Sequence, residues 1–207
     1  MTSEVVLNEI ELDALTELSN IAVSRTASAL RKMAGEQVFL SVPAVEVLDL
    51  DVAVARVRER ESEGVAAVKQ SFSGGFSGRA LLIFPEASSL QLVSIISGQG
   101  LLAEEAAALE DEALREVGNI LLSSCMASLA NMLNQPLALS IPTLLKGNGV
   151  LLIELGRDAG TGKVLFVYIN FSLQQRDVRG YVAVLLDVPS LFSLKAIIQE
   201  FIERSLA

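Results

Sequence analysis

The chain has 207 residues and a formal net charge of −9, and it contains one cysteine and no histidine. The negative charge disfavours nucleic acid as a partner, because its phosphates would be repelled. The lack of histidine excludes Ser-His-Asp and Cys-His catalysis and histidine-bound metals, and a single cysteine excludes a cysteine-based zinc site. Any chemistry must therefore use carboxylates, amides, hydroxyls or groups that a partner supplies.

The composition is that of a globular protein, with 51% apolar and 20% charged residues. No apolar run approaches the roughly 20 residues that cross a bilayer, and no signal-peptide pattern opens the chain. We therefore expect a cytoplasmic protein without membrane insertion. Cys125 lies in an apolar stretch, which favours a buried, reduced thiol over a nucleophile.

The first half should begin with a long amphipathic helix over residues 9–34, since Gly35 is a typical residue to follow a helix. After it we expect a strand at 38–42 that ends at Pro43, with 45–48 as its candidate extension, and then a solvated charged turn or edge at 56–64. A hairpin with strands at 65–72 and 79–84 and a helix at about 85–96 follow.

The second half repeats this order after a short acidic linker at 101–108. We expect a long helix at about 109–133, a strand at 136–141 followed by Pro142, a strand at 150–155, a hairpin with strands at 163–171 and 180–186, and a last helix at about 189–204.

The two halves share a sequence repeat as well as an element order. Residues 11–21 recur at 110–120, which is 99 positions later, and the register holds as far as Pro43 and Pro142. The pattern predicts one α+β domain over residues 1–207, made of two repeats at about 9–100 and 108–205. In it, a central antiparallel sheet carries two long helices related by a pseudo-twofold axis.

Each long helix carries a polar stripe, because residues three, four and seven positions apart share one helical face. The stripes consist of Asp13, Glu17, Asn20 and Ser24 in the first helix and of Glu112, Glu116, Asn119 and Ser123 in the second. A single stripe of this kind is usually just a solvated face. Packing explains apolar matches between the halves, such as Leu30 with Leu129 and Met33 with Met132. It does not explain Glu and Asn at identical offsets, so the stripes are candidate functional sites.

The pattern acidic-x3-Glu-x2-Asn-x22-Pro occurs twice, ending at Pro43 and at Pro142. It resembles the signature of the CheC/CheX/FliY phosphatases of bacterial chemotaxis, and two copies in about two hundred residues resemble the two-site, CheC-like form. The resemblance implies hydrolysis of the aspartyl phosphate of a CheY-like response-regulator receiver. It also implies possible binding of the deamidase CheD.

The same resemblance assigns roles to the repeated residues. Asn20 and Asn119 would position the attacking water, and Glu17 and Glu116 would pair with the active-site lysine of the receiver. No cofactor would be bound by this chain, because the receiver supplies Mg²⁺. Ancillary docking or structural roles remain for Asp13 and Glu112 at the helix starts and for Pro43 and Pro142 at the strand ends.

Two alternatives stay open at this point. The stripes could belong to a non-catalytic module that binds receivers or acts as a flagellar or chemotaxis adaptor, or they could serve oligomerisation. The copies also differ: Gly118 precedes Asn119, whereas Ser19 precedes Asn20, and Arg25 adds bulk beyond the first stripe. These differences favour the second site as the more active one.

Overall fold

An antiparallel sheet of eight strands organises the computed structural model, which describes residues 7–34, 38–42, 44–60, 64–86, 88–89, 103–147, 163–173 and 176–206. The elements are α1 (Glu9–Ala34), β1 (Val38–Ser41), β2 (Val45–Asp49), α2 (Leu50–Arg60), β3 (Val65–Gly74), β4 (Gly78–Pro85), α4 (Ala103–Met132), β5 (Leu137–Leu139), β6 (Thr143–Gly147), β7 (Lys163–Leu173), β8 (Arg176–Leu186) and α6 (Val188–Leu206). The predicted α+β class with a central antiparallel sheet is confirmed.

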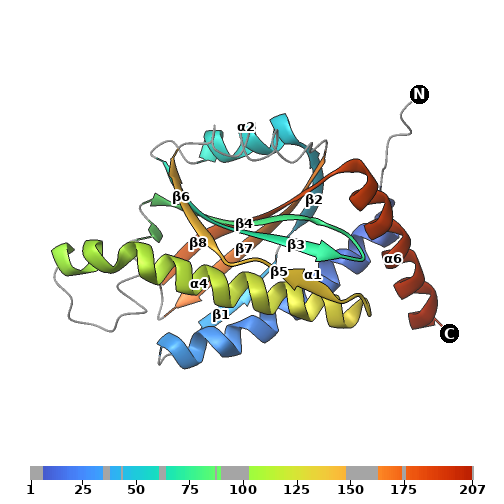
Figure 1. Ribbon diagram of the computed structural model, residues 1–207, viewed down its shortest axis with the longest axis horizontal. Helices are drawn as coiled ribbons and strands as arrows, with labels where there is room; N and C mark the ends of the chain where they lie inside the picture. The colour runs from blue at the N-terminus through green and yellow to red at the C-terminus, as the bar shows by residue number, and fades with distance from the viewer. Residues whose placement is uncertain are drawn as a thin grey trace.

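Helices cover both faces of the sheet (Figure 1). The long helices α1 and α4 lie on one face and α2 lies on the other, while α6 packs beside α1. Strand β4 shows why both faces need cover, because Leu82 and Phe84 belong to the core beneath α1 and α4, whereas Leu81 and Ile83 belong to the core beneath α2. A strand buried on both sides reads as a continuous apolar run, as β4 does.

The strand order reveals how the two repeats are combined. It runs β1-β7-β8-β4-β3-β5, with β2 also paired to β7 and β6 also paired to β3. Strands β1 and β2 of the first repeat therefore extend the hairpin of the second repeat, and β5 and β6 of the second repeat extend the hairpin of the first. Neither repeat completes its part of the sheet alone, which is a physical reason to expect one domain.

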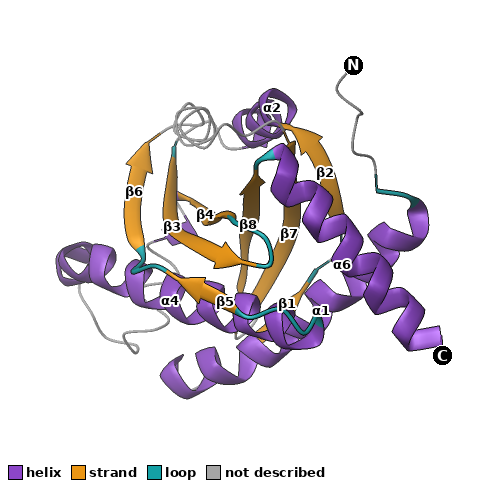
Figure 2. Cartoon of the chain, turned by 45° about the vertical axis from the view of Figure 1, so that its right-hand side comes forward, coloured by secondary structure: helices purple, strands orange, loops and turns teal. Residues whose placement is uncertain are grey.

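Residue pairing follows the repeat closely. Val38 pairs with Leu173, and Leu137, which lies 99 positions after Val38, pairs with Gly74. Residues near the pseudo-twofold axis meet their repeat equivalents or the neighbours of those equivalents. Thr26 Oγ1 lies 3.4 Å from Sγ of its equivalent Cys125, where α1 meets α4. In the sheet, Leu82 pairs with Val182, the equivalent of Ile83, and Ile83 pairs with Tyr181, the equivalent of Leu82. Figure 2 shows these two helices side by side against the sheet.

Two sequence predictions about local structure were wrong, and one strand was missed. Residues 56–60 of the charged run form the last part of α2 and not a solvated turn. The helix forms because Ala53, Val54 and Val57 are buried at helical spacing. The linker at 101–108 is helical from Ala103, since its Ala and Glu residues have high helix propensity. Strand β6 was missed because it contains a lysine and pairs only at the sheet edge.

Other predictions agree with the structure or fall outside it. Helix α1 matches its predicted bounds, both hairpins are present, and α6 extends slightly beyond residues 189–204. The strand predicted at 150–155 and most of the helix predicted at 85–96 lie outside the described residues. No helix in the described part of the chain is both long and apolar enough to cross a membrane.

Candidate functional site: two polar stripes

A capping box fixes the start of α1 and thus the position of the first stripe. Asn8 Oδ1 accepts a hydrogen bond from the Glu11 backbone N–H at 2.9 Å, and Glu11 Oε2 accepts one from the Asn8 N–H at 2.8 Å. The buried Glu11 carboxylate also accepts a hydrogen bond from Gln199 Nε2 at 2.7 Å and lies 3.4 Å from Lys195 Nζ, both on α6. These contacts anchor the helix, so Glu11 is structural.

The repeat equivalent of Glu11 is Glu110, which is also buried and anchored. Its carboxylate accepts hydrogen bonds from Ser89 Oγ and from Lys146 Nζ, the latter at 2.8 Å. Both long helices are therefore fixed by a buried carboxylate two residues before the first acidic residue of the stripe. The stripe carboxylates themselves are available for other contacts.

The stripes face outward, as the amphipathic pattern predicts. The four stripe carboxylates are exposed, namely those of Asp13, Glu17, Glu112 and Glu116. The two amides, those of Asn20 and Asn119, are half-buried. Each stripe thus presents charged groups to solvent over its first two turns and an amide set deeper in the surface. A partner can contact the carboxylates at the surface and reach the amide at the end of the row.

In the first stripe, the end of β1 holds the amide. Asn20 Oδ1 accepts a hydrogen bond from the Val42 backbone N–H at 3.0 Å. Val42 is buried, which keeps this donor in place. Pro43, the next residue, lies outside the described residues, so its predicted role stays a prediction.

In the second stripe, side chains hold the amide instead. Asn119 Oδ1 accepts a hydrogen bond from Ser123 Oγ at 3.2 Å, and Ser123 Oγ accepts one from Gln70 Nε2 at 3.2 Å. Gln70 Nε2 also donates to the Ser140 carbonyl at 2.8 Å. Sequence reasoning missed Gln70, although a glutamine within an apolar strand was a usable signal. Pro142, two residues after Ser140, is half-buried.

The glycine before Asn119 serves packing between α4 and β3. A Cβ at Gly118 would lie 2.5 Å from Cβ and Cγ1 of Val68, well inside normal contact distance. Only glycine therefore lets α4 approach β3 this closely. In the first half, the equivalent Ser19 is buried on α1 and lines a cavity.

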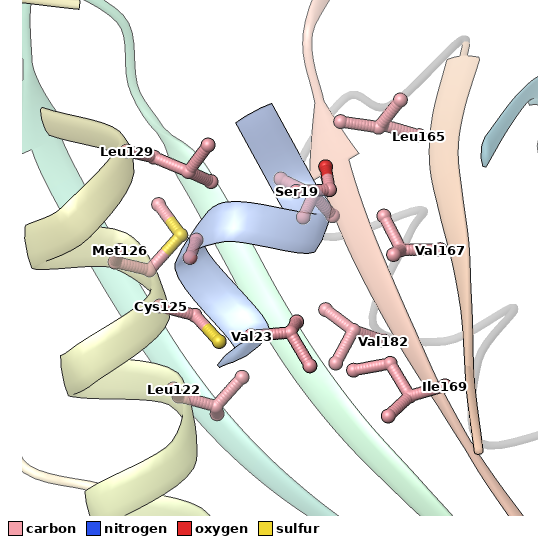
Figure 3. Close-up of a pocket in the computed structure, with 12 residues that line it drawn as sticks. Ser19, Val23, Leu122, Cys125, Met126, Leu129, Leu165, Val167, Ile169 and Val182 are labelled. Carbon is pink, nitrogen blue, oxygen red and sulfur yellow. The ribbon is translucent and has the colours of Figure 1, made fainter. Parts of the chain in front are cut away.

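That cavity has a volume of about 40 Å³ and lies between α1, α4, β7 and β8 (Figure 3). Its lining is apolar except for Ser19 and Cys125, so it offers no charged group to bind a phosphate. Cys125 is free and buried, as predicted, and burial raises the pKa of its thiol to about 11. A thiol in this state is a poor nucleophile near neutral pH.

No group of three or more acidic, cysteine or histidine side chains within the described segments is arranged to hold a metal ion. The carboxylates of each stripe are spread along a helix face instead. This arrangement suits contacts with a cationic group on another molecule.

Sequence comparison gives relatives of low identity, and no family model matches the chain. The flagellar motor switch phosphatase FliY of Bacillus subtilis is 24% identical over 174 residues, which cover 81% of this chain but only 43% of FliY. The CheY-P phosphatase CheC of Bacillus subtilis is 26% identical over 139 residues, or 66% of each chain. A putative CheY-P phosphatase, CheC1 of Halobacterium salinarum, is 24% identical and covers 76% of this chain and 80% of its own.

Solved structures share the fold at still lower identity. FliY of Thermotoga maritima has a TM-score of 0.73 at 18% identity, with 95% of this chain and 100% of that chain covered. The FliM middle domain of Vibrio alginolyticus has a TM-score of 0.63 at 12% identity, with 91% and 99% covered. The CheX–CheY–BeF3–Mg²⁺ complex of Borrelia burgdorferi has a TM-score of 0.53 at 16% identity, with 85% and 99% covered.

The architecture is therefore the duplicated α+β fold that FliY, FliM and CheX structures share. Taken together with the sequence matches to FliY, CheC and CheC1, it supports a CheC/CheX/FliY-type family protein. The predicted resemblance of the chain to this family is thus confirmed.

Proposed function

We propose that this chain hydrolyses the aspartyl phosphate of a CheY-like receiver, using one site on each long helix. The observation that carries the proposal is the repeated pair of an exposed glutamate and a half-buried asparagine whose amide oxygen accepts an internal hydrogen bond. The curated relatives CheC and FliY are named as phosphatases, and a structural neighbour is a CheX–CheY complex.

The asparagines supply the positioning that this reaction needs. An aspartyl phosphate is an activated acyl phosphate, and we expect the receiver to provide Mg²⁺ and a lysine, so a water in line with the scissile P–O bond is the missing part. In the described residues, the NH₂ groups of Asn20 and Asn119 donate to no other group. Each amide can therefore hold a water without removing its proton.

Glu17 and Glu116 act in docking. They lie one helical turn before the asparagines and are exposed, so each can pair with the receiver lysine and fix where the amide enters the phosphorylated site. Asp13 and Glu112, one turn further back, add negative charge that attracts the same cationic surface. This division predicts that the glutamates affect receiver affinity and that the asparagines affect turnover.

The test is phosphate release from phosphorylated receivers by the parent and by the double variant Asn20→Ala/Asn119→Ala. We expect the double variant to lose roughly 100-fold in rate, as for loss of a positioned catalytic group. Asn131→Ala is the matched control, because this substitution removes the same amide group at an exposed position about three turns beyond Asn119. A double variant as fast as Asn131→Ala would refute the proposal.

A second candidate is a binding module without turnover. It is favoured by the fold similarity to FliM, since solved structures include FliM bound to FliG and to SpeE of H. pylori. Such a module would need Glu17 and Glu116 but would tolerate loss of both asparagines. Binding of a receiver by a parent chain that releases no phosphate would favour this candidate, and the same binding assay with CheD would test the deamidase contact.

A further inference from the structure

A directed hydrogen-bond relay ends at the second asparagine. The Ser140 carbonyl can only accept, so at 2.8 Å it places the NH₂ group of Gln70 towards itself and fixes the orientation of that side chain. The other N–H of the same group points to Ser123 Oγ at 3.2 Å. Ser123 then accepts from Gln70. Its single hydroxyl proton has two acceptors within reach, Asn119 Oδ1 at 3.2 Å and Gln70 Oε1 at 3.4 Å, and the shorter distance favours Asn119.

The relay determines which end of the Asn119 amide is held internally. Because Oδ1 accepts from Ser123, the NH₂ group is turned away from Ser123, and it makes no hydrogen bond among the described residues. Gln70 is only 3% exposed, so water does not compete strongly for its amide. Gln70 therefore gives Ser123 a hydrogen-bond donor with a fixed orientation.

The first repeat reaches the same amide orientation by other means. The position equivalent to Gln70 is Ile169, which is buried and apolar, and the position equivalent to Ser123 is Ser24, which is exposed. There the donor to Asn20 Oδ1 is the Val42 backbone N–H. Both repeats therefore present an asparagine with its oxygen held internally, but only the second relies on side chains to do so.

We propose that Gln70 and Ser123 are positioning residues of the second site, which orient Asn119 for the attacking water and have no counterpart at the first site. The inference rests on the proposed phosphatase function. It adds that the two sites hold their asparagines by different contacts, so that substitutions at Gln70 or Ser123 weaken the second site and leave the first intact.

The kinetic test uses Asn20→Ala as background, so that only the second site works. In this background, Ser123→Ala should lower kcat about tenfold with KM within about twofold, as expected when one hydrogen bond that orients a reacting group is lost. Ser123→Thr, which keeps the hydroxyl, should restore most of kcat. Gln70→Ile, which copies Ile169 of the first repeat, should lower kcat in the same way as Ser123→Ala.

The matched control is Ser205→Ala in the same Asn20→Ala background, where kcat should not change, because Ser205 is exposed on α6 and belongs to neither stripe. Unfolding midpoints of all variants separate loss of orientation from loss of fold. Equal kcat for Ser123→Ala and its background would overturn the proposal.

A second readout does not depend on turnover. In the NMR spectrum of the otherwise unsubstituted chain, Ser123→Ala should shift the side-chain NH₂ resonances of Asn119 and leave those of Asn20 in place. Unchanged Asn119 resonances would overturn the relay even in an active phosphatase. Shifted resonances in a chain that dephosphorylates no receiver would instead support the relay and reject the proposed function.

Discussion

Valine substitutions at the two equivalent positions Gly118 and Ser19 should differ clearly in their effect on the stability of the fold. At Gly118 the first added carbon would lie 2.5 Å from two carbons of Val68, whereas ordinary carbon contacts are about 3.5–4.0 Å. Helix α4 would have to move about 1 Å from β3 to relieve the overlap. At Ser19 the added methyl groups would enter the cavity of about 40 Å³.

The expected magnitudes follow from this difference in space. Overpacking costs about 1–3 kcal/mol, and three added carbons place Gly118→Val near the upper end. The better helix propensity of valine offsets only about 0.5 kcal/mol. The net loss of about 2–3 kcal/mol lowers the melting temperature of a chain this long by roughly 4–12 °C.

Ser19→Val should change stability by less than about 1 kcal/mol, because it fills empty space and breaks none of the hydrogen bonds among the described residues. Thermal and urea unfolding of both variants beside the parent would measure the contrast. Equal melting temperatures for Gly118→Val and Ser19→Val would show that close α4–β3 packing is not what requires glycine.

Three further outcomes are expected. Burial raises the pKa of the Glu11 carboxyl, but hydrogen bonds from the Asn8 N–H and Gln199 and the charge of Lys195 outweigh it, so the pKa is lowered below 4.5. The ionised carboxylate therefore stabilises the fold above pH 4.5, and this stabilisation is lost as the pH falls through the folded-state pKa. Urea titrations should therefore show a steeper acid loss of unfolding free energy in the parent than in Glu11→Gln, and parallel curves would contradict this. Ile10 and Leu109 are 65% and 42% exposed at equivalent positions one turn before the stripes, so Ile10→Ser/Leu109→Ser should weaken receiver binding about tenfold by calorimetry; unchanged affinity would remove them from the docking surface. The Cys125 thiol, with its pKa raised to about 11 by burial, should react with an alkylating reagent at pH 8 only as fast as the chain unfolds, and rapid labelling of the folded chain would contradict its burial.

Elements defined by local patterns could be predicted from the sequence. Helix α1 begins at a capping box and has one apolar face, so its bounds agree with the structure. The repeat of Glu and Asn at equal offsets likewise led to both outward stripes. The helix bounds and each stripe depend on residues only a few positions apart, so the sequence alone is enough to predict them.

Pairings between distant residues could not be predicted in the same way. Two repeats of one pattern look identical whether β1 pairs with the strands of its own repeat or, as observed, with β7. The relay is a similar case, because Gln70 is 53 residues from Ser123 and 70 from Ser140. A buried glutamine signals that some polar partner exists, but only the sheet shows which one.

The charged run before β3 shows a different difficulty. Arg56, Arg58 and Arg60 alternate with acidic and apolar residues, and the charge obscures the buried positions of α2. Tertiary packing on Phe166, Tyr168 and Tyr181 decides the structure there.

The most direct test of two asparagine-dependent sites is the rate of phosphate loss from a saturating phosphorylated receiver, measured for the parent, for Asn20→Ala, for Asn119→Ala and for both together. Each single variant should retain part of the rate, with the larger loss in Asn119→Ala, and the double variant should fall roughly 100-fold below the parent. A double variant that keeps the parent rate would contradict the account, and complete loss in one single variant would show that only one stripe is a site.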